Sequence, residues 1–307
     1  MRKHICSVGL ALFAASPVAD AQPCSTHLLV SGYFSNNVAI HDACNGAYLR
    51  QLETSGRIQG AQAVRYNPAD DLIYVVSEGN DQIQRYRHNS AYEFVDVFAQ
   101  LAGNIDPTGI DFGSGGRIFV ASYGTSSVVE LDPASGAQIG VLLPSTSGLL
   151  GADNGMIVSA SGLVYVPGYD SNSVAKIDPA TGVVTSGFIP DGTAGLRNSR
   201  GIVDEGATIL VGGEGSGAIY RFSATSGAWI QTLVTGLNRP TGLTLAMDGT
   251  LLVLAGNAVR RYDRTTGAAL GVLTTLTAGG ISGGTFLALV PNPDFDRIYS
   301  NGFDPAG

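Results

Sequence analysis

Five polar residues that could contact a ligand recur about 45 residues apart along the chain: Gln62, Thr108, Asn154, Arg200 and Thr241. Their amide, hydroxyl and guanidinium groups could hydrogen-bond a small molecule or a glycan if the fold brought them together. Polar groups of this kind also commonly hold water and satisfy the ends of strands. Arg200 differs from the others, because its guanidinium either pairs with a carboxylate such as Asp153 or Glu214 or binds an anionic ligand.

A second set of side chains follows the apolar segments and could surround the same site. Tyr123 and Tyr169 offer aromatic faces, and Glu78, Asp170 and Glu214 offer carboxylates. Aromatic rings beside convergent polar groups are typical of ligand sites. We therefore expect a ligand-binding site formed by the five recurring residues together with Tyr123 and Tyr169, provided that the fold places these segments on one face.

The elements that must position these residues belong to a repeat, clearest in 118–136 and 164–182. Each unit has an opening apolar strand, a Gly or Asp turn, a continuous apolar strand, an alternating third strand and a short fourth strand. A period of about 45 residues built from short strands indicates propeller blades. The turn after each third strand begins with Asp132, Asp178 or Asp263, and Asp in such turns bonds the backbone two residues on, so these carboxylates are turn formers and not catalytic groups.

Six second strands can be counted, and they predict an all-β, six-bladed β-propeller of four-stranded antiparallel blades. The first unit lacks an opening strand, and Gly284–Val290 is expected to supply it, so that a C-terminal strand completes blade one and closes the ring. A seventh blade built from the last residues is the alternative. In a propeller, the loops before first strands and those between second and third strands meet around the channel mouth. This face is therefore the expected site.

The N-terminus predicts export to the periplasm or the exterior. Arg2 and Lys3 precede an apolar run and an Ala-Asp-Ala cleavage site, so residues 1–21 read as a signal peptide, with an uncleaved anchor as the alternative. The propeller is expected over 22–292 and a separate tail over 293–307. Cys24 and Cys44 remain in the mature chain as an even pair, and we expect them to form a disulfide.

Composition narrows the class of partner. The chain has 42 Gly, 14% charged residues and a formal net charge of −8. An acidic chain without clustered Lys and Arg disfavours nucleic acid and anionic lipid as partners. No apolar run after the N-terminal segment is long enough to span a membrane. We expect a monomer that binds a glycan, a small molecule or a protein.

The units resemble the YVTN and NHL families of propeller repeats. Val164-Tyr165-Val166 with the turn 178–182 is similar to the former, and Pro240-Thr241-Gly242-Leu243 with Asp248-Gly249 is similar to the latter. This resemblance covers most of residues 27–290. It implies the fold and leaves function open, because these families include enzymes, adhesive modules and proteins without known activity.

A more distant resemblance is to gluconolactonase-type propellers, which hold a divalent cation with Glu, Asn and Asp. It implies a metal-dependent hydrolase or lactonase, with Asn154 as the amide ligand and carboxylates from Glu78, Asp170 or Glu214. The chain departs from that pattern because no Glu begins a first strand. A streptogramin-lyase-type propeller would require a channel histidine, and the histidines are expected outside the channel.

The sequence thus favours an exported, non-catalytic propeller without a cofactor that binds a ligand at the channel mouth. The metal-dependent hydrolase is the alternative. The tail, with Arg297-Ile298-Tyr299 and Gly302-Phe303-Asp304, is similar to short Ile-Phe-x-x-Gly-Phe-Glu endings of exported bacterial proteins. It is expected to be either a sorting element or a strand against blade one.

Overall fold

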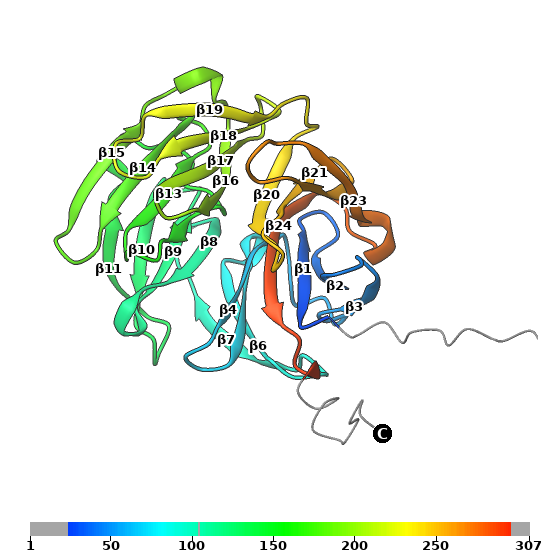
Figure 1. Ribbon diagram of the computed structural model, residues 1–307. Coiled ribbons are helices and arrows are strands. Elements are labelled where there is room, and N and C mark those ends of the chain that lie inside the picture. The colour runs from blue at the N-terminus through cyan, green and yellow to red at the C-terminus, as the bar shows by residue number, and fades with distance from the viewer. Residues whose placement is uncertain (1–23, 104, 296–307) are drawn as a thin grey trace, which may run out of the picture.

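The computed structural model describes residues 24–103 and 105–295. Within them the strands form six separate four-stranded antiparallel sheets arranged as blades around a channel (Figure 1). The predicted six-bladed propeller is confirmed, and the alternative of a seventh blade is wrong because the last strand joins the first sheet. The predicted signal peptide and the tail beyond residue 295 lie outside the described residues.

The blades have the following strands, each given from the channel outward. Blade 1 consists of β24 (Gly284–Pro291), β1 (Thr26–Gly32), β2 (Asn37–Asp42) and β3 (Tyr48–Gln51). Blade 2 consists of β4 (Ala61–Asn67), β5 (Leu72–Ser77), β6 (Gln82–Arg87) and β7 (Phe94–Gln100). Blade 3 consists of β8 (Pro107–Phe112), β9 (Ile118–Ser122), β10 (Ser127–Leu131) and β11 (Gln138–Leu143).

The second half of the ring repeats this order. Blade 4 consists of β12 (Ile157–Val158), β13 (Val164–Gly168), β14 (Ser173–Asp178) and β15 (Val183–Ile189). Blade 5 consists of β16 (Ser199–Asp204), β17 (Thr208–Gly213), β18 (Ala218–Ser223) and β19 (Trp229–Val234). Blade 6 consists of β20 (Pro240–Leu245), β21 (Leu251–Ala255), β22 (Ala258–Tyr262) and β23 (Ala269–Thr275). The helical segments are short 3-10 turns: η1 (Glu78–Asn80), η2 (Ser114–Gly116), η3 (Ser145–Ser147), η4 (Thr193–Gly195) and η5 (Leu276–Gly279).

The core lies between blades because the second strands bury both of their faces. In β5 every residue after Leu72 is buried, and all of β9, β13 and β21 is buried. Continuous apolar runs are expected where sheets pack on both sides of a strand. First strands of neighbouring blades contact each other, as β4 contacts β8 and β20 contacts β24, so they line the channel. None of the described residues forms a helix with the length and hydropathy of a membrane span.

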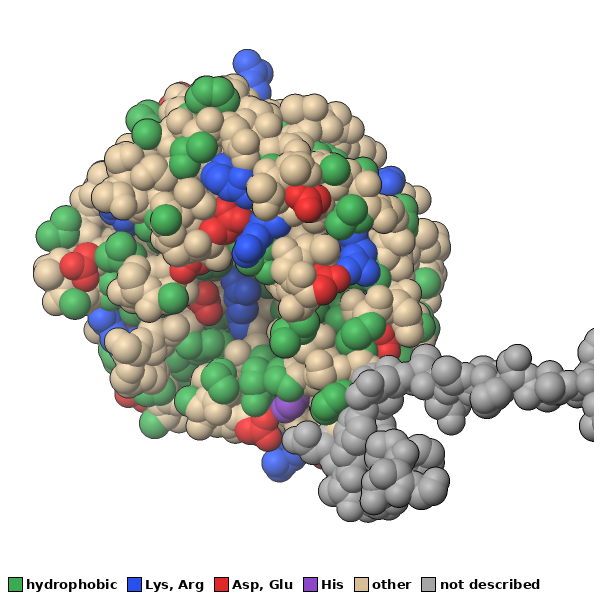
Figure 2. All heavy atoms as spheres, viewed as in Figure 1, with side chains coloured by type: hydrophobic (Ala, Val, Ile, Leu, Met, Phe, Trp, Pro, Cys, Tyr) green, Lys and Arg blue, Asp and Glu red, His purple; other side chains and the backbone are tan. Residues whose placement is uncertain are grey.

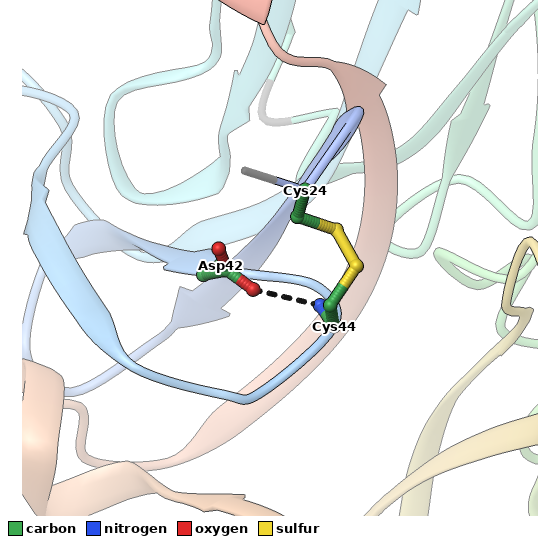
Figure 3. Close-up of side chains that lie close together, drawn as sticks. All are labelled: Cys24, Asp42 and Cys44. Atoms are coloured by element: carbon green, nitrogen blue, oxygen red, sulfur yellow. Dashed lines mark hydrogen bonds between the residues drawn. A yellow bond between two sulfur atoms is a disulfide. The ribbon is translucent and has the colours of Figure 1, made fainter. Parts of the chain in front are cut away.

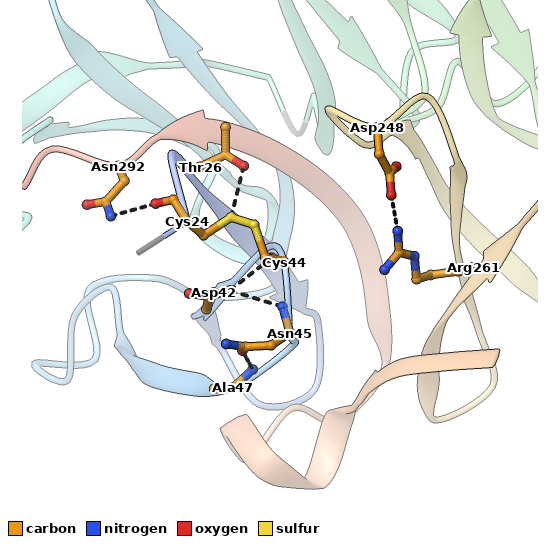
Figure 4. Close-up of a disulfide and its surroundings, with 9 residues drawn as sticks. All are labelled: Cys24, Thr26, Asp42, Cys44, Asn45, Ala47, Asp248, Arg261 and Asn292. Atoms are coloured by element: carbon orange, nitrogen blue, oxygen red, sulfur yellow. Dashed lines mark hydrogen bonds and ion pairs between the residues drawn. A yellow bond between two sulfur atoms is a disulfide. The ribbon is translucent and has the colours of Figure 1, made fainter. Parts of the chain in front are cut away.

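The first and last strands of the propeller pair with each other in blade 1, and this pair is the seam of the ring. β24 and β1 are antiparallel neighbours, drawn red and blue in Figure 1, with Thr26 opposite Pro291 and Gly32 opposite Gly284. The predicted disulfide is confirmed: Cys24 and Cys44 are bonded with their Cα atoms 5.7 Å apart (Figure 3). The Cys44 amide donates to Asp42, and Asn292 after the seam strand donates its side-chain amide to the Cys24 carbonyl (Figure 4).

The repeated turns hold neighbouring blades together. Asp132 Oδ1 accepts hydrogen bonds from the amides of Ala134 and Ser135, which confirms its role as a turn former. Gly136 closes this turn with φ +70°, and a Cβ built there would lie 2.0 Å from the Phe98 carbonyl oxygen of the preceding blade. Glycine is therefore required both by its conformation and by the close approach of the backbone.

Candidate ligand-binding site at the channel mouth

A cavity of about 730 Å³ lies at the channel mouth. Figure 2 shows a hollow near the centre of the viewed face, with basic and acidic side chains gathered in it. Its walls come from loops between second and third strands and from the starts of first strands, as the propeller geometry predicts. The lining residues are Tyr33, Phe34, Gln62, Glu78, Thr108, Tyr123, Asp153, Tyr169, Arg200, Asn238, Arg239, Thr241, Gly256, Asn257, Gly283, Gly284 and Thr285.

Most of the sequence-predicted ligand residues line this cavity. Six do so: Gln62, Thr108, Tyr123, Tyr169, Arg200 and Thr241. Asn154, the seventh, is fully buried below them and does not line it.

Threonine hydroxyls at the ring join neighbouring first strands. Thr108 Oγ1 donates to the Ala152 carbonyl at 2.8 Å, and Thr241 Oγ1 donates to the Gly284 carbonyl at 2.9 Å. Thr285 in β24 donates to the Ala61 carbonyl at 2.8 Å, so all three hydroxyls reach the segment that opens the next blade, although Ala152 lies before β12 and not in it. Each hydroxyl proton is thus committed to the next blade, so these residues close the ring and offer a ligand only oxygen lone pairs.

A chain of hydrogen bonds leads from the mouth into the channel. Gln62 Nε2 donates to Glu78 Oε2, and Asn154 Nδ2 donates to Gln62 Oε1 at 2.8 Å. The Asn154 amide also donates to the Thr285 carbonyl at 3.1 Å. Asn154 therefore orients Gln62, and Gln62 in turn orients the Glu78 carboxylate toward the cavity wall.

Glu78 is the titratable group in this wall. Its pKa is raised to about 7, mainly by burial and also by the charges of Asp153 and Asp106, whereas the hydrogen bond from Gln62 and the charge of Arg200 oppose the change. The negative charge of Glu78 in turn raises the pKa of the Tyr33 hydroxyl. A carboxyl group with a pKa near neutrality can exchange protons at working pH.

Two arginines in the cavity are neutralised by carboxylates of the protein itself. Arg200 Nη1 lies 2.5 Å from Glu214 Oε2, and Arg200 Nε lies 3.3 Å from Asp153 Oδ2 in an ion pair. Arg239 Nε donates to Glu214 Oε1 at 2.8 Å. Burial opposes ionisation of Glu214, yet the two guanidinium groups hold its pKa below the usual range. The carboxylate-paired alternative for Arg200 is therefore the one that the structure shows.

Aromatic side chains form the rim. Phe34 is 74% exposed and meets Tyr33 edge to face, with ring centroids 5.3 Å apart. Tyr123 and Tyr169 make a similar contact at 6.3 Å. The Arg200 guanidinium carbon lies 5.8 Å from the Tyr169 ring centroid. Burial and the adjacent Asp170 raise the pKa of Tyr123 to about 12, so its hydroxyl stays protonated and can donate a hydrogen bond.

The four candidate metal ligands do not converge on one point. Glu214 is occupied by two arginines, Asp170 lies beside Tyr123, and Glu78 accepts from Gln62. In the described part of the chain, the one group of three or more acidic, Cys or His residues with ligand atoms within 4.8 Å of each other is Cys24, Asp42 and Cys44, and its sulfurs form the disulfide. The donor set of Glu78, Asp170 and Glu214 does not fit a shared cation.

The described histidines lie away from the cavity, as the sequence predicts. His27 bonds the Tyr92 hydroxyl at 2.7 Å, His41 is buried in blade 1, and His88 contacts Asp71 at 2.8 Å.

Asn238, Arg239 and Thr285 are polar lining residues that the sequence did not indicate. Thr285 could have been found, because Gly284–Val290 was predicted to open blade one and Thr285 stands where Thr241 stands in blade 6. Arg239 has φ +50°, an uncommon conformation for a residue other than glycine, and no local pattern predicts it.

Comparison with known proteins supports the fold alone. No family model matches the chain, and no curated protein sequence is similar to it. Its structure is similar to one in a nidogen/laminin complex (TM-score 0.72, 13% identity, covering 87% of this chain and 99% of that one). It is also similar to a protein of unknown function from Bacteroides caccae (TM-score 0.65, 14% identity, covering 87% of this chain and 99% of that one). A third similar structure is a catalytically inactive virginiamycin B lyase from Staphylococcus aureus with quinupristin (TM-score 0.62, 12% identity, covering 88% of this chain and 93% of that one).

Proposed function

We propose that this protein is an exported, non-catalytic propeller of the YVTN/NHL repeat type that binds a saccharide at the channel mouth. The observation that carries the proposal is the pairing of charges in the cavity. Arg200 and Arg239 are compensated by Glu214 and Asp153, so the two arginines present no uncompensated positive charge to attract an anion. The remaining lining consists of amides, hydroxyls, aromatic rings and the Glu78 carboxyl, whose pKa of about 7 leaves it partly protonated at neutral pH.

This lining suits a neutral, polyhydroxylated ligand. Amide and hydroxyl groups satisfy sugar hydroxyls, while Phe34 and the paired Tyr123 and Tyr169 offer apolar faces for a sugar ring. A cavity of about 730 Å³ is within the range of small-molecule sites. The disulfide supports export, because such bonds persist in oxidising compartments.

The test is binding of neutral oligosaccharides to the mature protein, found by glycan screening and measured by calorimetry. The double variant Tyr123→Ala with Tyr169→Ala should weaken binding at least tenfold, because it removes two rings that make up the rim. Tyr48→Ala is the matched control, since this tyrosine is similarly exposed but lies on the outer strand of blade 1. Undiminished binding by the double variant would place the ligand elsewhere.

A second candidate function, hydrolysis of the bound ligand, is favoured by one observation: the pKa of Glu78 is about 7 in the cavity wall. A carboxyl with this pKa can serve as a general acid or base. If the protein is a hydrolase, Glu78→Gln should abolish turnover while leaving ligand affinity within a few fold. A divalent cation bound by purified protein, detected by elemental analysis, would return the metal-dependent form of this function to consideration.

A further inference from the structure

A second cavity opens beside the channel mouth, at the junction of blades 5 and 6. Its volume is about 530 Å³, and it lies between the end of β19 with the loop after it and the strands β22 and β23. Asn238, Gly256 and Asn257 line both this cavity and the mouth, so the two are adjacent parts of one surface. A linear ligand that occupied both cavities would pass over these three residues.

The chemistry of this junction differs from that of the mouth. Its lining includes the amides of Asn238 and Asn257, the guanidinium of Arg260 and the ring of Tyr262, and no acidic residue. Arg260 is half-buried, and within the described residues its side chain makes no hydrogen bond or ion pair. Arg261, its neighbour in β22, is paired with Asp248 (Figure 4). Arg260 is thus a cation in a concave surface without a counter-charge from the protein.

The repeat shows that this arginine is not required by the fold. Arg260 is the third residue of its strand and stands opposite Val253. In the other five blades the third residue of the third strand also faces a valine, and each of these residues is buried: Ala39, Gln84, Val129, Ala175 and Tyr220. Blade 6 alone among the six places a cation at this position, and it opens the position to a cavity.

We propose that the junction between blades 5 and 6 is a subsite for a carboxylate of the ligand, bound by Arg260. This inference rests on the proposed function and refines it: the ligand is a linear acidic saccharide, with a neutral portion in the mouth and a uronic acid carboxylate in the junction. A guanidinium binds a carboxylate through charge-assisted hydrogen bonds. The Asn257 and Asn238 amides stand where they can accept and donate bonds to the same sugar.

The experiment compares an aldotriouronic acid, which has one uronic acid and two neutral sugars, with its methyl ester, which lacks the charge and adds a single methyl group. Calorimetry with the wild-type protein should show about tenfold tighter binding of the acid, and added salt should reduce this preference. Arg260→Gln should bind both probes equally, whereas Arg260→Lys should keep part of the preference. Arg87→Gln, an exposed arginine in blade 2, is the control and should behave as wild type. Melting temperatures establish that each variant is folded.

The outcomes separate this inference from the proposed function. Equal affinity of the wild type for acid and ester, with both lost in the Tyr123/Tyr169 double variant, would keep the saccharide site and overturn the carboxylate subsite. A preference for the acid that survives in folded Arg260→Gln would also overturn it. Failure of the wild type to bind either probe or any neutral oligosaccharide would overturn the proposed function and this inference with it.

Discussion

Replacing Glu78 with glutamine should stabilise the protein against unfolding at neutral pH but not at acidic pH. The pKa of Glu78 is about 7 in the folded protein against 4.5 for an unperturbed glutamate, and burial is the main cause. Ionisation of this carboxyl therefore opposes folding. The contribution of protonated Glu78 to the free energy of unfolding is complete below pH 4.5 and is lost as the pH rises through about 7. The glutamine amide of the variant has no proton to lose and still offers an oxygen to Gln62.

The magnitude follows from the pKa difference, which corresponds to about 3.4 kcal/mol at most. Because the side chain is partly open to the cavity, solvent screening reduces this to about 2 kcal/mol. For a domain of this size, such a gain raises the melting temperature by about 3 to 4 °C. Asp153, Asp106, Arg200 and Tyr33 are the charged or titratable groups around Glu78, and they remain in the variant.

The assay is thermal unfolding of wild type and Glu78→Gln at intervals from pH 4 to pH 8.5. The two melting temperatures should coincide near pH 4 and diverge up to about pH 8. Glu130→Gln supplies a control of opposite sign, since hydrogen bonds from Arg117 hold the pKa of Glu130 low and its loss should destabilise at neutral pH. A stabilisation of Glu78→Gln that is the same at pH 4 and pH 8 would refute the reasoning.

Two further predictions concern the backbone and the disulfide. Gly155→Ala should lower the yield of folded protein sharply, because the new Cβ would lie 1.8 Å from the carbonyl oxygen of Arg200. Gly187→Ala is the control and should fold normally, because no atom lies within 4 Å of a Cβ at that position. Circular dichroism and expression yield check both variants. Replacing Cys24 and Cys44 with serine should reduce the free energy of unfolding by about 3 kcal/mol in urea titrations, and an unchanged urea midpoint would contradict this value.

The fold was predictable because its signals are local and repeated. The apolar run Leu72–Val76, one of the six second strands counted in the sequence, lies in β5, and the predicted seam strand Gly284–Val290 is β24 with one more residue. Blade 4 is the least regular, since its opening strand is only Ile157–Val158. Just before this strand, Gly155 passes against the Arg200 backbone, and no sequence pattern in blade 4 contains that tertiary contact.

The position of the site was predictable from the sequence, but the pairing and charge of its side chains were not. Register along the repeat placed Gln62, Thr108 and Thr241 at the mouth, and the structure finds them there. The repeat register could not decide between the paired and the ligand-binding alternatives for Arg200. Its partners Asp153 and Glu214 come from two different blades, and their distances from Arg200 depend on side-chain conformation. Arg260 was missed for a related reason: its difference from other blades appears only once the strands are aligned by their observed pairing.

The pairing of β1 with β24 also decides how the protein responds to tension. Both chain ends leave blade 1 from the same end of this antiparallel pair, beside Thr26 and Pro291. A force that pulls the ends apart therefore loads the hydrogen bonds of the pair one after another, as in a zipper, instead of loading all of them at once. The Cys24–Cys44 bond transfers that load to the turn between β2 and β3, so β1 stays attached to β2 while β24 peels away. The ring should open mechanically at its seam, with five blades still intact.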